Sequence, residues 1–135
     1  MKRIGCFLLA ALLTVSLSAC GISIRGDEPA VLTFEGPYTN GHDGPPQTLT
    51  AEETTRVEEI LEEAEYIPSG AGCPFKENVS ISFGDRVFAI SCDGCNTVLD
   101  IEAQRYYEVT REGRQYIIDL FKKYMGYFPS SEASW

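Results

Sequence analysis

One segment constrains the fold more than any other: between Asn78 and Ile101, apolar and polar residues alternate, and turn residues interrupt the alternation twice. A period of two predicts strands with one buried face. Gly84-Asp85 and Asp93-Gly94 separate the runs, and Asp-Gly is typical of two-residue hairpin loops. We therefore predict an antiparallel meander with strands at 78–83, 86–92 and 95–101.

The two expected hairpin loops also predict which residues face one another. In the first hairpin a two-residue loop pairs Ile81 with Phe88, and in the second it pairs Phe88 with Leu99. Both hairpins then place Phe88 beside apolar partners on one face, an agreement that a one-residue slip in either would break. The second loop also pairs Cys92 directly with Cys95.

One helix is expected before the meander in the sequence and another after it. The first is predicted at 51–66, because Thr50 and Glu53 form a capping box ahead of an apolar stripe. The second begins after Thr110 and ends at Gly126, a residue type that favours helix termination. The two stripes, at helical spacing, are Val57, Ile60, Leu61 and Ala64, and Ile117, Leu120, Phe121 and Tyr124.

These elements predict an α+β fold: an antiparallel meander of three to four strands with two helices packed on one face. The fourth strand would lie at 105–109, and 30–34 could form another short strand. We expect one domain at 30–129, preceded by a tether at 20–29 and followed by a tail at 130–135. Residues 30–49 are largely loop, and the sequence leaves open whether they belong to the core.

The N-terminus has the features of a secretory signal peptide at 1–19. Lys2 and Arg3 precede an apolar run that is shorter than the about 20 residues of a membrane-spanning helix. The run ends in Leu17-Ser18-Ala19-Cys20, which resembles the lipobox of bacterial membrane lipoproteins. The resemblance implies a diacylglyceryl group on the Cys20 sulfur, cleavage before Cys20, and a protein anchored on the extracytoplasmic face of the cell membrane.

The remainder of the chain has a weaker resemblance. The segments Asp-Gly-Cys-Asn at 93–96 and Arg-Tyr-Tyr-Glu-Val-Thr at 105–110 are similar to those of small uncharacterised lipoproteins of Gram-positive bacteria. This similarity implies no particular activity.

Charge and motif content narrow the function classes. A formal net charge of -9 at pH 7 argues against nucleic acid as a partner. No nucleophile elbow, phosphate-binding loop, zinc-protease motif or EF-hand loop is present, so we expect no cofactor and no catalytic residues. The sequence therefore favours a non-catalytic binding or accessory module at the cell surface.

Three cysteines remain beyond Cys20, and in an exported protein they favour a disulfide. We expect Cys73 to bond the hairpin end that carries Cys92 and Cys95, with Cys92 as the better partner. A bond between Cys92 and Cys95, leaving Cys73 free, is the other option. The alternative function is a thiol-active or zinc-binding envelope protein that uses Cys92-x-x-Cys95, and the weak metal set would be Cys73, Cys92, Cys95 and His42.

Two surfaces could bind a protein partner. The helix at 51–66 is rich in glutamate, which is usually a solvated face but would also suit a basic partner. Aromatic residues gather in the C-terminal third, where most are expected in the core and an exposed subset would form a binding patch. They are Tyr106, Tyr107, Tyr116, Tyr124, Tyr127, Phe128 and Trp135.

Overall fold

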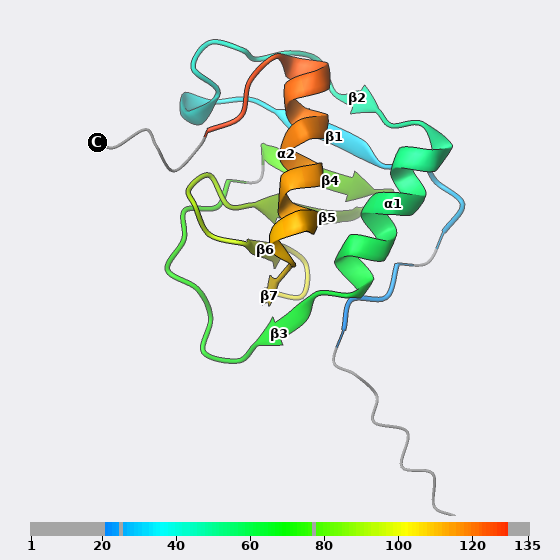
Figure 1. The fold of residues 1–135 in the computed structure, drawn as a ribbon, viewed down its shortest axis with the longest axis vertical. Coiled ribbons are helices and arrows are strands. Elements are labelled where there is room, and N and C mark those ends of the chain that lie inside the picture. The colour runs from blue at the N-terminus through cyan, green and yellow to red at the C-terminus, as the bar shows by residue number, and fades with distance from the viewer. Residues whose placement is uncertain (1–20, 25, 77, 130–135) are drawn as a thin grey trace, which may run out of the picture.

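The computed structural model describes residues 21–24, 26–76 and 78–129, which form an α+β fold (Figure 1). They contain a seven-stranded antiparallel sheet in the order β2-β1-β4-β5-β6-β7-β3. The strands are β1 (Val31–Phe34), β2 (Gln47–Thr48), β3 (Glu65–Ile67), β4 (Val79–Phe83), β5 (Arg86–Ile90), β6 (Thr97–Asp100) and β7 (Arg105–Glu108). The helices are α1 (Ala51–Glu62), α2 (Arg111–Met125) and the 3-10 turn η1 (Pro37–Thr39).

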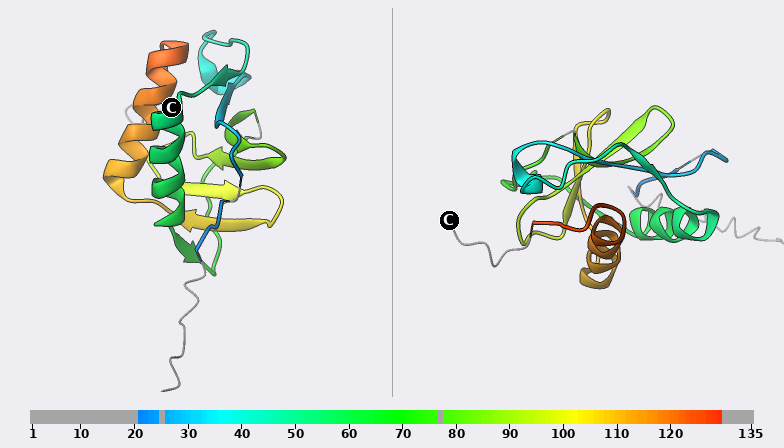
Figure 2. Two further views of the ribbon diagram at one scale, coloured as in Figure 1. Left: turned by 90° about the vertical axis from the view of Figure 1, so that its right-hand side faces the viewer. Right: turned by 90° about the horizontal axis from the view of Figure 1, so that it is seen from above.

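Both long helices lie on one face of the sheet, as Figure 2 shows. The core between the two layers is mainly apolar, and its largest side chains are nearly inaccessible to solvent. Leu32, Phe34, Ile81, Phe88 and Ile90 come from the sheet, and Val57, Leu61, Ile117 and Phe121 come from the helices. The predicted class and the placement of the helices are confirmed.

The strand count was predicted too low. Strands β4 to β7 form the expected four-stranded meander, but β1 and β2 extend it at one edge and β3 extends it at the other. β1 belongs to the core, because Leu32 and Phe34 are both 0% exposed. β2 and β3 have only two and three residues, and strands this short carry too little alternation for a sequence pattern to show.

The two predicted hairpins had different outcomes. The first is confirmed, because Ile81 pairs with Phe88. The second is wrong by one residue: Phe88 pairs with Asp100, and Ile90 pairs with Val98. Asp93-Gly94 lies inside a longer connection at 91–96, where the Asp93 carboxylate accepts a hydrogen bond from the Cys95 N–H at 2.9 Å. Asp93 and Gly94 therefore form a turn that the Asp93 side chain stabilises, rather than a two-residue hairpin loop.

The shifted register turns Val98 and Asp100 toward the helices instead of Leu99. Asp100 is 1% exposed, and a buried carboxylate needs a partner. Arg86 supplies it with hydrogen bonds from Nε at 3.2 Å and from Nη2 at 2.8 Å. The polar pair therefore fills a position that the predicted register reserved for an apolar side chain.

α1 begins as predicted and ends earlier than predicted. Its capping box is present, with Thr50 and Glu53 bonding each other's backbone. The helix stops at Glu62, and Tyr66, which we expected near its end, pairs in β3 with Tyr107. α2 follows the prediction: Thr110 caps it, and Gly126 ends it in the left-handed conformation with φ 76°.

The segment expected to be a tether contacts the domain. Ile22 is 4% exposed and belongs to the core, and Ile24 packs against it. The expected signal peptide, Cys20 and the tail at 130–135 lie outside the described residues. Among the residues that are described, no helix has the length and apolar character needed to cross a bilayer.

Glu53 links the two helices through a buried carboxylate. It accepts hydrogen bonds from Lys123 Nζ at 2.6 Å, from the Tyr124 hydroxyl at 2.7 Å and from the Thr50 N–H at 3.0 Å. Burial alone would raise the pKa of Glu53, but the hydrogen bonds from Lys123, Thr50 and Tyr124 outweigh it and lower the pKa from 4.5 to about 2. The charged form therefore stabilises the fold.

We predict that Glu53→Gln lowers the free energy of unfolding by about 2 kcal/mol at pH 7, because three bonds to a charged group lose that charge. A carboxyl with a lowered folded-state pKa stabilises the fold above its unfolded pKa and ceases to do so as the pH falls through the folded value. The difference between wild type and variant should therefore shrink from about pH 4.5 to about pH 2. Urea unfolding across this range measures it. Glu52→Gln, at an exposed site on the same helix, is the control, and a pH-independent difference would contradict the assignment.

Candidate functional site

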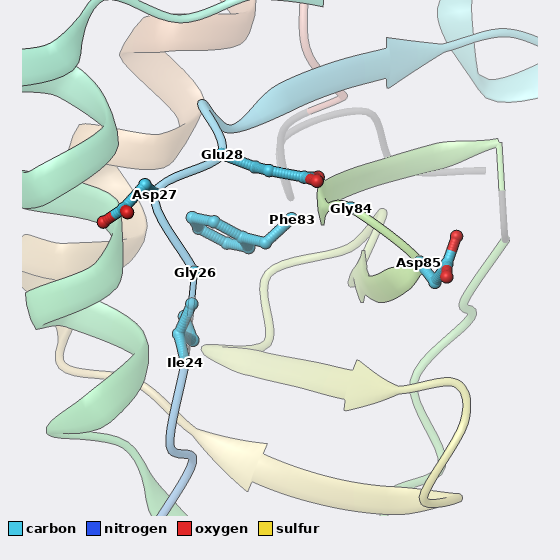
Figure 3. A pocket seen from close by; sticks show the side chains of 7 residues that line it. All are labelled: Ile24, Gly26, Asp27, Glu28, Phe83, Gly84 and Asp85. Carbon is cyan, nitrogen blue, oxygen red and sulfur yellow. The ribbon is translucent and has the colours of Figure 1, made fainter.

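An extended segment that connects the start of the described chain to β1 carries two exposed carboxylates. We call residues 26–29 the acidic strap; it contains Asp27 and Glu28. In Figure 3 the strap passes beside Phe83, with Glu28 directed toward Gly84 and Asp27 directed toward α1. The N–H of Ala30, at the end of the strap, bonds the Thr54 hydroxyl of α1 at 3.1 Å. The strap is thereby held between the β4–β5 turn and the first helix.

A shallow hollow lies on each side of the acidic strap. The first has a volume of about 300 Å³, and Ile24 and Phe83 supply its apolar part while Asp27, Glu28 and Asp85 supply carboxylates. The second has a volume of about 310 Å³ and lies against α1, where Thr54, Thr55 and Glu58 line it. Asp27 and Glu28 border both hollows, so each combines an anionic rim with a partly apolar floor.

The surface around the acidic strap is negative. α1 exposes Glu52, Glu59 and Glu62, the C-cap residue Glu63 is also exposed, and Glu58 is half-buried. Arg56, the basic residue of this helix, pairs with Glu59 at 2.9 Å. Within the described residues the other ion pairs join Arg86 to Asp100 and Lys123 to Glu53, so neither Asp27 nor Glu28 has a cationic partner there. Arg25 lies outside the described residues.

The sequence does not predict this site, because residues 20–29 have the pattern of a tether. The signal available was the alternation of Ile22 and Ile24 with polar neighbours, too short to indicate a packed segment. The predicted acidic helix does contribute, with one correction. Glu53 faces the second helix rather than a partner, since it is 8% exposed and bonded to Lys123.

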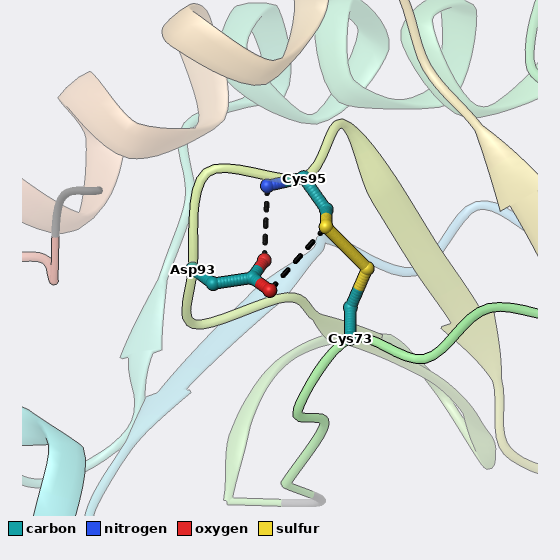
Figure 4. A group of neighbouring side chains, drawn as sticks. All are labelled: Cys73, Asp93 and Cys95. Atoms are coloured by element: carbon teal, nitrogen blue, oxygen red, sulfur yellow. Dashed lines mark hydrogen bonds between the residues drawn. A yellow bond between two sulfur atoms is a disulfide. The ribbon is translucent and has the colours of Figure 1, made fainter.

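A disulfide joins Cys73 to Cys95, with the two Cα atoms 6.6 Å apart (Figure 4). The prediction that Cys73 bonds this end of the sheet is confirmed, but the preferred partner, Cys92, is wrong. Cys92 is free and buried. The other option, a bond between Cys92 and Cys95, is also wrong.

The register of the second hairpin explains the error. Cys92 belongs to the apolar core, on the same face as Ile90. The Cys73 sulfur lies 3.8 Å from the Thr97 hydroxyl, and Thr97 alternates with the core residue Val98 and thus faces away from the helices. The shifted register therefore turns Thr97, at the start of β6, to the side of the sheet where Cys73 lies. Cys95, which precedes β6, can bond Cys73 there, whereas Cys92 packs into the core.

The disulfide loop is also held by α2. Arg114, in the first turns of that helix, donates from Nε to the Cys95 carbonyl at 2.6 Å and from Nη2 to the Asp93 carbonyl. The Ser91 hydroxyl donates to the same Cys95 carbonyl at 2.6 Å. These hydrogen bonds satisfy backbone carbonyls of the irregular connection at 91–96. Arg114 and Ser91 therefore stabilise the conformation of the loop that carries Cys95.

The free thiol is poorly suited to chemistry. Burial raises the pKa of Cys92 to about 11, and the nearby Asp93 carboxylate adds to the rise. A nucleophilic or metal-binding cysteine needs its thiolate, which this pKa disfavours at neutral pH. The geometry therefore lends no support to thiol chemistry at Cys92.

The predicted metal set is not assembled. His42 stacks on Tyr127 with ring centroids 5.2 Å apart, beyond the C-terminal end of α2, whereas Arg114 near the start of α2 contacts the Cys95 loop. The rise of a helix between these points is about 18 Å. The Cys73, Asp93 and Cys95 side chains do have ligand atoms within 4.8 Å of one another, but the two sulfurs are bonded to each other and offer no thiolate.

The C-terminal aromatics are mainly packing residues. Tyr107 and Phe128 are buried in the core, and Tyr116, Tyr124 and Tyr127 are partly buried against it. Tyr106 lies in a tilted contact with Phe75, with ring centroids 5.7 Å apart, and Trp135 is outside the described residues. Among the described residues, Tyr66 is the exposed large hydrophobic side chain, at 41%.

Comparisons of the chain with protein-family models, with curated proteins and with solved structures gave no match.

We predict that non-reducing peptide mapping finds one bridge, between Cys73 and Cys95, and that the Cys92 thiol is alkylated only in denaturant. The double variant Cys73→Ala/Cys95→Ala should lose about 3 kcal/mol of stability, the loop-closure value for a separation of 22 residues. Cys92→Ala is the control, because it should leave the bridge in place. A bridge that contains Cys92 would contradict the structure.

Proposed function

We propose that this protein is a non-catalytic binding module, anchored by a lipid on Cys20 at the extracytoplasmic face of the cell membrane. Its binding surface is the acidic strap with the neighbouring face of α1. Its partner is a basic segment of another protein. The single observation that carries this proposal is the pair of hollows that share Asp27 and Glu28.

The chemistry of the hollows suits lysine and arginine side chains. These residues have an apolar stem and a charged head, and they tend to bury the first while the second stays at a polar rim. Phe83 and Ile24 offer apolar area for a stem, and Asp27 and Glu28 offer carboxylates for a head. Charge-assisted hydrogen bonds of this type are stronger than neutral ones.

The second candidate, a thiol-active or zinc-binding protein that uses Cys92 and Cys95, has less support. Cys95 is held in a disulfide and Cys92 is buried in the core with a raised pKa. Either activity would first require reduction of the bridge between Cys73 and Cys95. A binding module makes no such demand on the cysteines.

The proposed anchor predicts a specific N-terminus. The Leu17–Cys20 motif after a basic start and a short apolar run supports it. Intact-mass and peptide analysis of the protein isolated from cell membranes should find Cys20 as the first residue, with a diacylglyceryl group on its sulfur. Cys20→Ser should remain unprocessed, and an unmodified N-terminus at another residue would rule out the anchor.

We predict that the double variant Asp27→Asn/Glu28→Gln weakens the binding of a fluorescent lysine-rich peptide by about tenfold, the equivalent of 1.4 kcal/mol. Fluorescence anisotropy at low salt measures the dissociation constant, and added salt should weaken the wild-type interaction. The matched control is Glu102→Gln/Glu112→Gln, which removes the same charge from exposed sites elsewhere. Equal weakening in both variants would show attraction to net charge alone and contradict a site at the strap.

A further inference from the structure

The chain enters the folded domain almost immediately after Cys20. Ile22 is 4% exposed in the core, the Ser23 carbonyl accepts a hydrogen bond from Arg86, and the Ile24 N–H lies 3.5 Å from Glu62 Oε1. A residue spans at most about 3.6 Å, so the Cα of Cys20 can lie no more than about 7 Å from that of Ile22. A lipid on Cys20 would therefore have no flexible tether between it and the domain.

This entry point lies at one end of the molecule. In Figure 1 and in the left view of Figure 2, the first described residues lie beside β3 and the C-terminal end of α1. β2, η1 and the C-terminal end of α2 lie at the other end. We call the end formed by residues 21–24, β3 and the last turn of α1 the basal end.

The basal end carries a side chain that suits a membrane interface. Tyr66 in β3 is 41% exposed, and the Arg105 guanidinium lies 5.8 Å from the centre of its ring. Tyrosine and arginine both combine an apolar body with a polar head and favour the headgroup region of a bilayer. Glu62, Glu63 and Glu65 are exposed at the same end, so the free domain has no electrostatic attraction to anionic lipid.

We infer that the lipidated protein stands on the bilayer by its basal end, with Tyr66 in the headgroup layer and β2 directed away from the membrane. The inference rests on the proposed lipid attachment. Because the connection between Cys20 and Ile22 is short, the lipid would hold the basal end against the bilayer. The acidic strap begins four residues after Ile22 and so lies within about 15 Å of it. A partner would then meet the acidic strap close to the membrane surface.

Tryptophan quenching by brominated lipid tests this orientation. In a Trp135→Phe background, a single tryptophan is placed by Tyr66→Trp in edge strand β3, or by Thr48→Trp in edge strand β2 as the matched control, since both positions are exposed. Each lipidated protein is reconstituted in vesicles of plain or brominated phosphatidylcholine. Tyr66→Trp should lose about half of its emission in brominated vesicles, because interfacial indoles lie near the acyl boundary, and Thr48→Trp should lose none.

A second preparation separates this inference from the proposed anchor. Residues 20–135 are coupled at Cys20 to a maleimide lipid, which spares the bridged Cys73 and Cys95 and the buried Cys92. Selective quenching at Tyr66→Trp in this preparation supports the orientation, even if the protein from cells carries no lipid and the anchor proposal fails. Equal quenching at both positions, or none at Tyr66→Trp, overturns it in either preparation. Near-wild-type unfolding midpoints confirm that the variants are folded.

Discussion

Pairing of β1 with β4 is the interaction on which the rest of the arrangement depends. Leu32 lies opposite Ile81 and Phe34 opposite Val79, so the N-terminal segment continues the apolar face of the meander. Phe34 then contacts Phe121 of α2, with ring centroids 5.4 Å apart. Because β1 is held here, the residues before it run between the β4–β5 turn and α1. This segment forms the acidic strap, its two hollows and the entry point at the basal end.

The cysteines and the carboxylates have distinct structural roles. Cys73 and Cys95 close an irregular loop that Arg114 also holds, whereas Cys92 is a core residue with a protonated thiol. Glu53 is likewise internal, since its hydrogen bonds to Lys123 and Tyr124 join the helices. Cysteines and a carboxylate that could be candidates for chemistry or binding in the sequence thus stabilise the fold, and the proposed binding surface rests on carboxylates that are exposed.

The proposed anchor and the proposed binding surface are connected by a very short stretch of chain. Ile22 is in the core and Asp27 is in the acidic strap, so a lipid on Cys20 would place that surface near the bilayer. The net charge of -9 would keep the domain from adhering to anionic lipid on its own. Contact with the membrane would then follow from the covalent linkage, and contact with a basic partner from the acidic strap.

The features that could be predicted from the sequence are those that depend on neighbouring residues. The capping box of Thr50 and Glu53, the stop at Gly126 and the loop at 84–85 are local, because each is formed by side chains or backbone within a few positions. Apolar periodicity likewise identified both helices and the meander. Three other features could not be predicted in this way: the register after Asp93, the pairing of Tyr66 with Tyr107, and the packing of Ile22. Each of these features depends on groups distant in the sequence. In a short segment, such tertiary contacts determine the conformation more strongly than the apolar periodicity of the segment itself. The choice of Cys95 over Cys92 shows this most clearly, since a shift of one residue turned Thr97, which contacts the Cys73 sulfur, to the face of the sheet opposite the helices.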